Sequence, residues 1–280
     1  MQIIKTPEEM QRTAQALRRE EKTIGFVPTM GFLHEGHLSL MRIAREHSDV
    51  LVASIFVNPT QFGPNEDLDA YPCDFERDEK LCRAEGVDVL FYPSPENMYL
   101  DGHSVWVSEN ALTGVLCGAV RPGHFRGVCT VVTKLLNIVS PDIMVMGEKD
   151  AQQLRVLRRM VRDLNFPVKI VGGAIIREAD GLAMSSRNKY LSTADRAEAL
   201  CLFQGLEKAK SLFAAGERDA ETVKHAVLKI IAKTSGTVDY IEILDDESLQ
   251  VSRSFEKPAL LALAVKFPGA RLIDNVVLGK

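Results

Sequence analysis

The sequence lacks the patterns that define membrane, secreted and nucleic-acid-binding proteins. No apolar run approaches the length of a membrane span, and charges at Lys5, Glu8 and Glu9 interrupt the N-terminus where a signal peptide needs an apolar core. Positive charge is not in excess either, because 34 basic residues stand against 38 acidic ones, for a net charge of -4. Such a chain has no general attraction for phosphate backbones. We therefore expect a cytoplasmic protein with neither a membrane nor a nucleic acid as partner.

Cysteine is scarce, and its spacing argues against two common kinds of site. The five residues are odd in number, far apart and without any CxxC pair: Cys73, Cys82, Cys117, Cys129 and Cys201. Neither a disulfide framework nor a zinc site built from cysteine fits this pattern. Reduced thiols in a cytoplasm are the simplest interpretation, and we expect them to be core or surface residues without a chemical role.

Two familiar nucleotide-binding loops are missing as well. The sequence contains no GxxxxGK[ST] element and no GxGxxG after a predicted strand, which argues against a P-loop kinase and a dinucleotide-dependent dehydrogenase. What the sequence does contain is a hydrophobic fraction of 46% over 280 residues. That is enough for one large core or two smaller ones.

Apolar runs rich in β-branched residues alternate with helical patterns through the first two thirds of the chain. Strands that are apolar on both faces and separated by helices indicate a parallel sheet covered on both sides. The prediction is therefore an α/β fold with a doubly wound, Rossmann-like parallel sheet. Predicted strands lie at about 23–29, 49–57, 87–93, 142–148 and 168–176, and predicted helices at about 36–47, 74–85, 126–139 and 150–164. In the last of these helices, the residues at helical spacing that we expect to face the core are Leu154, Leu157, Val161 and Leu164.

The character of the sequence changes near Arg177, where a polar stretch includes the turn signal Asp180-Gly181. Helices followed by adjacent strands suggest a small α+β unit beyond this point. We therefore divide the chain into a Rossmann-like domain, residues 1–176, and a smaller C-terminal α+β domain, residues 177–280. In the second domain, helices are predicted at about 193–215 and 219–234, and strands at about 238–245, 259–267 and 270–278.

The stretch VPTMGFLHEGHLSLM places two histidines at the junction of a predicted strand and a predicted helix. His34 and His37 are three apart, whereas the zinc-binding HExxH pattern places its histidines four apart, so a zinc site is disfavoured. As a junction, Gly31 allows the chain to turn and Gly36 allows the backbone to approach a ligand closely. Exposed N–H groups at the helix start would attract a phosphate, to which the histidines could donate hydrogen bonds. Two ordinary surface histidines are an equal alternative on this motif alone.

Three further polar segments are candidates for ligand binding. VNPTQFGP follows a predicted strand at the edge where open α/β sheets bind ligands, and it supplies the amides of Asn58 and Gln61. VMGEKDAQQ supplies Lys149 as a phosphate contact and Gln153 one turn into the next helix. AMSSRN adds a combination suited to phosphate: Ser185, Ser186 and Arg187. The alternative for VNPTQFGP is a plain turn, and for AMSSRN it is a Ser-rich loop before a helix.

In this order, the motifs resemble a known family. GFLHEGH is similar to the HIGH element of nucleotidylyltransferases and class I aminoacyl-tRNA synthetases, and AMSSRN resembles their KMSKS-type element. The set PTMGFLHEGH, SIFVNPTQF, DLDAYP, RPGHFRGVCTVV, GEKDAQQ and DGLAMSSRN closely resembles the pantoate–β-alanine ligase family over nearly the whole chain. The resemblance implies an ATP-dependent condensation of pantoate with β-alanine to pantothenate, AMP and pyrophosphate through a pantoyl-adenylate.

The resemblance also implies roles for individual residues. His37 matches the family's proton donor, with His34 beside it. Gln61 and Gln153 match pantoate-binding glutamines, Gln61 also neighbouring β-alanine, and Asn58 is a further substrate-binding candidate. The remaining catalytic candidates, which would hold the phosphates together with Ser186, are Lys149, Ser185 and Arg187. The residues implied to contact ATP are Met30, Gly31, Phe32, Leu33, His34, Glu35, Gly36, His37, Gly147, Glu148, Lys149, Asp150, Ile176, Met184, Ser185, Ser186 and Arg187.

Further expectations concern the metal, the assembly and the motion. Mg²⁺ should accompany ATP, but its protein ligands cannot be identified from the sequence, and Asp78 is only a weak candidate. Residues 177–188 are expected to form a hinge that lets the C-terminal domain close over the adenylate as a lid. A homodimer is implied by the family. Two alternatives stay open: a nucleotidylyltransferase that stops at a nucleotide-transfer product, and a nucleotide-sensing or scaffold protein.

Overall fold

The computed structural model of the chain describes residues 1–64, 66–255 and 258–279. The chain divides into two compact units. The first unit comprises residues 1–113, 117–148 and 153–174. The second comprises residues 114–116, 149–152 and 175–280. The chain therefore passes into the second unit at three places, one of which interrupts the GEKD motif.

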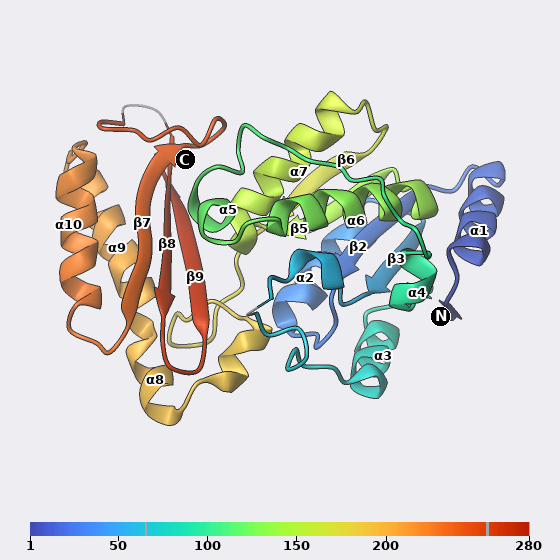
Figure 1. Cartoon of the computed structure of the whole chain (residues 1–280), viewed down its shortest axis with the longest axis horizontal. Coiled ribbons are helices and arrows are strands. Elements are labelled where there is room, and N and C mark those ends of the chain that lie inside the picture. The colour runs from blue at the N-terminus through green and yellow to red at the C-terminus, as the bar shows by residue number, and fades with distance from the viewer. Residues whose placement is uncertain (65, 256–257, 280) are drawn as a thin grey trace. The chain divides into compact units, whose positions relative to one another are not determined.

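A parallel sheet forms the centre of the first unit (Figure 1). Its strand order is β1-β4-β3-β2-β5-β6, and every neighbouring pair is parallel. Because β2 neighbours both β3 and β5, the order reverses beside β2, and open α/β sheets bind ligands at such a switch point. The doubly wound, Rossmann-like prediction is confirmed. The strands are β1 (Gln2–Ile4), β2 (Ile24–Thr29), β3 (Val50–Ile55), β4 (Val89–Phe91), β5 (Ile143–Gly147) and β6 (Lys169–Gly173).

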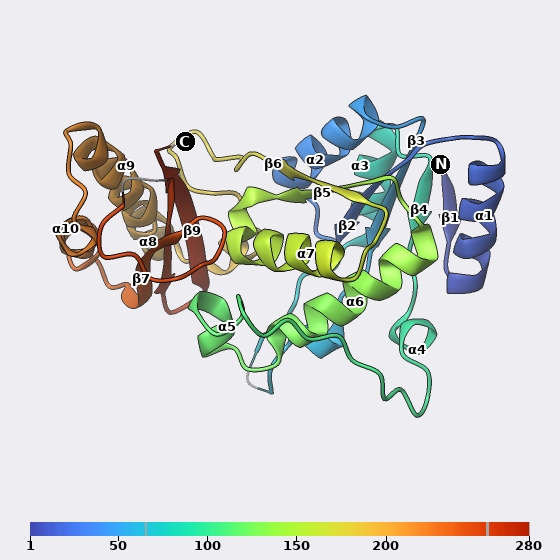
Figure 2. The same ribbon diagram turned by 90° about the horizontal axis from the view of Figure 1, so that it is seen from above.

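Helices cover both faces of this sheet. Figure 2 shows α2 and α3 on one side and α6 and α7 on the other. On the first side, Met41 of α2 and Cys82 of α3 pack into one buried cluster with Val27 and Leu51 of the sheet. The helices are α1 (Pro7–Arg19), α2 (Glu35–Glu46), α3 (Phe75–Ala84), α4 (Pro95–Met98), α5 (Leu116–Val120), α6 (His124–Val139) and α7 (Ala151–Asp163), with the short 3-10 turns η1 (Pro59–Gln61) and η2 (Glu148–Asp150).

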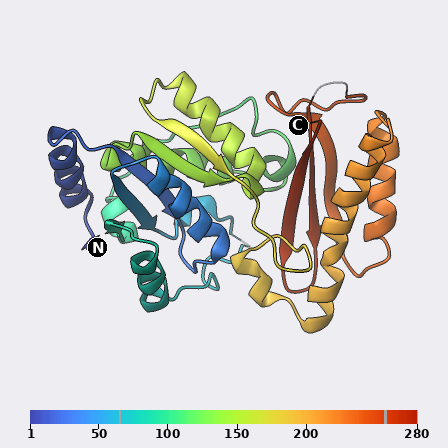
Figure 3. The same ribbon diagram turned by 180° about the vertical axis from the view of Figure 1, so that it is seen from behind.

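The second unit is built on an antiparallel sheet of order β7-β8-β9. The central strand β8 is buried from Ala259 to Val265, because both neighbours pair with it and helices pack against the sheet. Figure 3 shows α9 and α10, drawn in orange, beside the red strands. The α+β prediction is confirmed. The elements are η3 (Ser186–Tyr190), α8 (Thr193–Glu198), α9 (Leu200–Ala214), α10 (Ala220–Ile231), β7 (Thr237–Asp245), β8 (Ala259–Lys266) and β9 (Arg271–Leu278).

The N-terminal segment contains two elements that the sequence patterns do not predict, β1 and α1. The signals for α1 are ordinary: Thr6 accepts a hydrogen bond from the Glu9 N–H at 3.3 Å, and Pro7 occupies the first helical turn. Only Met10 and Ala14 of this helix are buried. So narrow an apolar face gives a weak periodic pattern, and periodicity alone therefore does not reveal the helix.

The buried face of α7 differs from the predicted one at its C-terminal end. Leu154 and Leu157 are 1% and 0% exposed, as predicted, but Leu164 is 50% exposed. The helix ends at Asp163, so Leu164 lies beyond the last turn and cannot follow the helical spacing. Met160, 4% exposed, occupies the core position instead.

Two of the cysteines are buried thiols whose surroundings suppress their reactivity. Within the described residues, no disulfide joins any of the five cysteines. Burial raises the pKa of Cys82 and of Cys129 to about 12, so both thiols stay protonated and unreactive near neutral pH. In the described part of the chain, no helix has the length and apolar character that crossing a bilayer would require.

A pair of leucine truncations in α7 tests this packing. Leu157→Ala should lower the free energy of unfolding by about 2–5 kcal/mol, because it leaves a cavity in the core. Leu164→Ala is the matched control and should change the free energy by no more than about 0.5 kcal/mol. Urea unfolding measures both values. Equal losses in the two variants would contradict the assignment of the buried face.

Candidate active site

The chain turns sharply between β2 and α2. Gly31 and Phe32 both adopt positive φ angles, 85° and 48°. Glycine takes this conformation without strain, whereas phenylalanine does so only where the surroundings enforce it. The carboxylate of Asp78 in α3 accepts the N–H of Phe32 at 2.6 Å and that of Leu33 at 2.8 Å. A buried carboxylate therefore fixes the turn that leads to the two histidines.

His34 and His37 are held in one orientation at the start of α2. His34 is the N-cap residue, and its Nδ1 accepts the N–H of Gly36 at 3.1 Å. Nδ1 of His37 accepts the N–H of His34 at 3.3 Å, and the two ring centroids lie 4.1 Å apart. An imidazole whose Nδ1 accepts carries its proton on Nε2 when it is neutral. Each ring therefore has a defined Nε2–H donor at the positive end of a helix.

The structure adds two details to the sequence interpretation. A Cβ at Gly36 would lie 2.8 Å from Cε1 of His34, so this glycine makes room for the imidazole, and the close approach of a ligand to its backbone stays a prediction. The turn's N–H groups are also used within the chain, since the amides of Phe32, Leu33, His34 and Gly36 all donate to side chains. These four amides are therefore engaged within the chain, and the attraction of a phosphate to the start of α2 stays a prediction. The histidine side chains and the helix dipole also favour an anion at this junction.

Gln61 lies beside the same turn although it comes from the segment after β3. Its Nε2 donates to Sδ of Met30 at 3.3 Å, and its Oε1 accepts from Nδ2 of Asn58 at 3.1 Å. Asn58 is 1% exposed, and its Oδ1 accepts from the hydroxyls of Tyr99 and Thr60. Asn58 is therefore placed to hold Gln61, and its predicted direct contact with substrate stays a prediction.

The segment before and within α6 supports Gln61 from the main-chain side. Nδ1 of His124 donates to the Gln61 carbonyl at 2.9 Å, and Arg121 donates to the same oxygen at 3.4 Å. Arg121 also makes two 2.6 Å hydrogen bonds to Glu66, which lower the pKa of Glu66 to about 2. A Cβ at Gly127 would lie 2.4 Å from the carbonyl oxygen of Thr60. The sequence does not predict a supporting role for any of these α6-side residues or for Glu66.

The GEKD motif is divided between the two units. Gly147 ends β5 and pairs with Gly173 of β6, and Glu148 begins η2, all in the first unit. Gln153, also in the first unit, is half-buried in the first turn of α7. The second unit contains Lys149 and Asp150.

The second unit contains the remaining predicted ATP contacts. A tight hairpin centred on Gly181 brings Ile176 beside Met184, whose N–H donates to the Ile176 carbonyl at 2.9 Å. Ser185 caps η3 and accepts the Arg187 N–H at 3.3 Å. Ser186 is the next residue and is 8% exposed. The MSSR segment is therefore a hydrogen-bonded turn rather than an unstructured loop.

Two consecutive residues of β9 connect these segments within the second unit. Asp274, with a side chain 1% exposed, accepts two hydrogen bonds from Arg177 at 2.6 and 3.0 Å. Asn275 donates from Nδ2 to the carbonyl of Lys149 at 2.9 Å. Strand β9 thereby holds Lys149 of the GEKD motif and the start of the hairpin that leads to MSSR. The sequence of β9 does not indicate this role, because its pattern is that of an ordinary strand.

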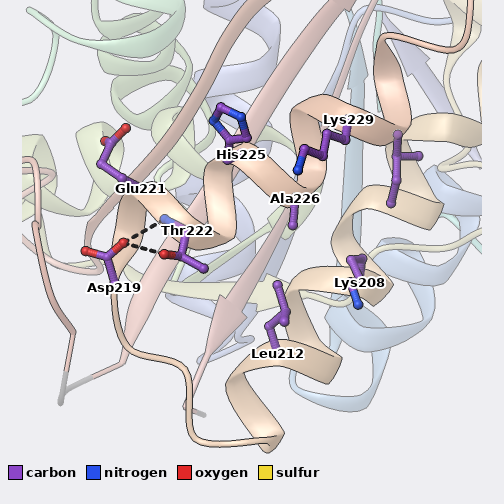
Figure 4. Close-up of a pocket in the computed structure, with 9 residues that line it drawn as sticks. Lys208, Leu212, Asp219, Glu221, Thr222, His225, Ala226 and Lys229 are labelled. Atoms are coloured by element: carbon purple, nitrogen blue, oxygen red, sulfur yellow. Dashed lines mark hydrogen bonds between the residues drawn. The ribbon is translucent and has the colours of Figure 1, made fainter.

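A large hollow elsewhere in the second unit does not belong to this site. It measures about 710 Å³ and lies between α9 and α10, lined by Lys208, Asp219, His225 and Lys229 among others (Figure 4). No residue predicted to bind a ligand lines it. Asp219 there caps α10, accepting the N–H and the hydroxyl of Thr222 at 2.7 Å each. This carboxylate thus has a structural role.

Comparison with known proteins identifies the family. The family model for pantoate-beta-alanine ligase matches residues 2–277. The chain belongs to the pantoate–β-alanine ligase family. A pantothenate synthetase from Thermotoga petrophila is 56% identical over 280 residues, covering 100% of both chains.

Solved structures of the same family match the fold. A pantothenate synthetase from Thermus thermophilus superposes with a TM-score of 0.93 at 45% identity, covering 99% of each chain. The pantoate–β-alanine ligase of Francisella tularensis, solved in complex with Beta-gamma ATP and β-alanine, gives a TM-score of 0.83 at 34% identity, covering 99% of this chain and 97% of that one. The recognition made from the motifs is confirmed at the level of family and fold.

A glycine substitution tests the support beneath Gln61. Alanine normally stabilises a helix interior by about 1 kcal/mol over glycine. Gly127→Ala should instead destabilise by about 1–3 kcal/mol, because the new methyl meets the Thr60 carbonyl, which cannot move aside cheaply. We also expect faster hydrogen exchange over residues 58–64.

The control is Gly114→Ala, because a Cβ at Gly114 meets no atom within 4 Å. It should leave both the free energy of unfolding and the exchange over residues 58–64 near the wild-type values. A Gly127→Ala variant more stable than the wild type would mean that α6 does not pack tightly on η1.

Proposed function

We propose that the chain condenses pantoate with β-alanine at the expense of ATP, through a pantoyl-adenylate. The observation that carries the proposal is the pair of imidazoles at the start of α2. Their Nδ1 atoms accept backbone N–H groups, so each presents an Nε2–H donor. Family membership gives the substrate class, and the ATP and β-alanine in the Francisella tularensis structure support it.

In the first step, a carboxylate oxygen of pantoate attacks the α-phosphorus of ATP, and the bond to the pyrophosphate oxygen breaks. Negative charge grows on the oxygens around the α-phosphorus and on the departing pyrophosphate. Nε2–H of His37 and of His34 would donate to these oxygens, which is electrostatic stabilisation of a developing charge. Because both rings are fixed by backbone hydrogen bonds, they need little reorganisation during the step.

In the second step, the β-alanine amine attacks the pantoyl carbonyl, the bond from that carbon to the AMP phosphate oxygen breaks, and the nitrogen gives its proton to water. Gln61 and Gln153 are proposed to hold pantoate, with Gln61 also beside β-alanine, and Asn58 to keep Gln61 in place. An amide can bind a hydroxyl or a carboxylate without adding charge to the site. The fixed Gln61 side chain, tied to Met30 and Asn58, supports this role.

The ATP contacts carried over from the family form two groups, one in each unit. The first is Met30 to His37 with Gly147 and Glu148, and the second is Lys149, Asp150, Ile176 and Met184 to Arg187. Lys149, Ser185, Ser186 and Arg187 are proposed to hold the phosphates, since ammonium, hydroxyl and guanidinium donors suit phosphate oxygens.

Mg²⁺ fits this chain only as the partner of ATP. Within the described residues, no group of three or more histidine, cysteine or acidic side chains is arranged to hold a metal ion. Asp78 is not placed to hold it, because its carboxylate is 1% exposed and accepts two amide N–H groups. Mg²⁺ commonly binds through substrate phosphates and water with few protein ligands, and it would neutralise triphosphate charge here.

Three further features are proposed from the family resemblance. They are a homodimer, a cytoplasmic location and a lid role for residues 177–280 that would protect the adenylate from water. Analytical ultracentrifugation of the full chain tests the first of these.

The function is tested by following AMP and pyrophosphate with ATP and pantoate, with and without β-alanine. AMP release that requires pantoate and β-alanine together supports the ligase. Nucleotide retained in a stable product would point to a nucleotidylyltransferase instead. ATP binding without turnover under any of these conditions would contradict the enzymatic proposal.

Two substitutions of His37 test the roles of its two ring nitrogens separately. His37→Asn keeps an acceptor near the Nδ1 position and removes the Nε2–H donor, so turnover should fall about a hundredfold or more. His37→Gln places an amide N–H near the Nε2 position and should retain more activity. Steady-state AMP release measures both.

The matched control is His47→Ala, since His47 is an exposed histidine at the other end of α2. Its turnover should equal that of the wild type. A wild-type rate in His37→Asn would remove His37 from the reaction.

A further inference from the structure

The carboxylate of Asp78 holds the turn that precedes His34, a role that the sequence does not indicate. Asp78 belongs to α3, 44 positions after His34 in the chain, yet its two oxygens accept the consecutive N–H groups of Phe32 and Leu33 at 2.6 and 2.8 Å. These are the last two amides before His34. The side chain is 1% exposed, so both oxygens are largely shielded from bulk solvent.

The turn held by Asp78 has conformations that need such a partner. Phe32 has a φ of 48°, which is costly for a residue with a side chain and persists only when the surroundings fix it. Gly31, with a φ of 85°, precedes it, and a Cβ there would lie 3.1 Å from Oδ2 of Asp78. The carboxylate therefore packs directly against the turn as well as binding it.

Core packing and an adjoining cavity both border this turn, since Leu33 is fully buried in the hydrophobic cluster of the first unit. A cavity of about 380 Å³ borders it, lined by Met30, Gly31, Ile55, Phe75 and Asp78 among others. The two hydrogen bonds to Asp78 act beside this packing, and they restrain the amides of Phe32 and Leu33 directly.

Arg77 contacts both Asp78 and Phe32. Its guanidinium lies 3.4 Å from Oδ1 of Asp78 and 5.2 Å from the centroid of the Phe32 ring. Burial raises the pKa of Asp78, and the N–H groups of Leu33 and Phe32, with the charge of Arg77, oppose that rise. Burying a carboxylate is costly, so its presence here calls for an explanation beyond packing.

We propose that Asp78 is a positioning residue for the adenylation step, fixing the 31–33 turn so that the imidazoles of His34 and His37 hold their Nε2–H orientation. Asp78 acts through the turn and touches neither substrate nor phosphate. The chain of contacts is short: Asp78 holds the amides of Phe32 and Leu33, and the next amide, that of His34, donates to His37. The proposal rests on the function proposed above.

The test variant is Asp78→Asn, which has the same shape but only one acceptor oxygen. The NH₂ group of the asparagine must face either the Phe32 or the Leu33 N–H. That hydrogen bond is lost, and two hydrogen-bond donors then point at each other without an acceptor. We expect kcat to fall about tenfold or more, because small misplacement of catalytic groups has large effects on rate. The KM for pantoate should change less than twofold, since Gln61 and Gln153 are untouched.

Asp74→Asn is the matched control on the same helix. Asp74 is exposed and caps α3 by accepting the Arg77 N–H at 3.1 Å, a task that asparagine performs equally well. Its kcat and unfolding midpoint should match the wild type. Asp78→Glu, which keeps the charge but moves the carboxylate by one methylene, is the second variant and carries the same test if Asp78→Asn does not fold.

A second readout does not depend on turnover. In ¹⁵N-histidine-labelled protein, the imidazole signals of His34 and His37 should indicate the Nε2–H tautomer in the wild type and in Asp74→Asn. They should shift towards a mixture in the Asp78 variant. A folded Asp78 variant with wild-type kcat and wild-type imidazole signals overturns the proposal, as does a loss of rate that only follows the unfolded fraction. A wild-type protein without turnover would refute the proposed function, and the imidazole signals would still decide the role of Asp78.

Discussion

The need to satisfy backbone N–H groups in the turn after β2 governs the candidate site. A parallel strand that leads into a helix leaves several amides without ladder partners at that point. Here each of those amides from Phe32 to His34 finds a side chain, first Asp78 and then His37. The bond from His34 sets the tautomer of His37, and a further amide, that of Gly36, sets the tautomer of His34. The backbone hydrogen bonds of this junction therefore also orient the two candidate imidazoles.

The same principle recurs around the other functional segments. Asn58 and His124 hold the side chain and the main chain of Gln61, and Asn275 holds the main chain of Lys149. In each case a polar side chain holds a loop that follows a strand. His124 and Asn275 come from other elements, whereas Asn58 is a buried residue of the same loop. Such buried polar contacts stabilise little on balance, but they specify one arrangement, because leaving any of them unmade is costly. This accounts for loop segments that are each held in one arrangement within their own unit.

Much of the fold follows from patterns that are local in the sequence. The parallel sheet is predictable because its strands are apolar on both faces, and the second unit because two amphipathic helices precede three apolar strands. The exceptions have equally local causes. Helix α1 buries only Met10 and Ala14, which is too narrow a face to give a clear period. Leu164 follows the helical spacing in sequence but lies after the last helical residue, where the spacing no longer applies.

The sequence by itself determined the family, the fold class and the identity of the candidate residues, because each of these is encoded in short motifs and in the periodicity of apolar residues. The tertiary structure alone decided how those residues are held. Asp78 binds the Leu33 amide 45 positions away, and Asn275 binds the Lys149 carbonyl 126 positions away, and no local pattern marks either contact. The structure also decided that Gly36 accommodates an imidazole and that the N–H groups of the turn are occupied. Hydrogen bonds between distant segments depend on how the strands are ordered in the sheet. No single stretch of the sequence determines that order.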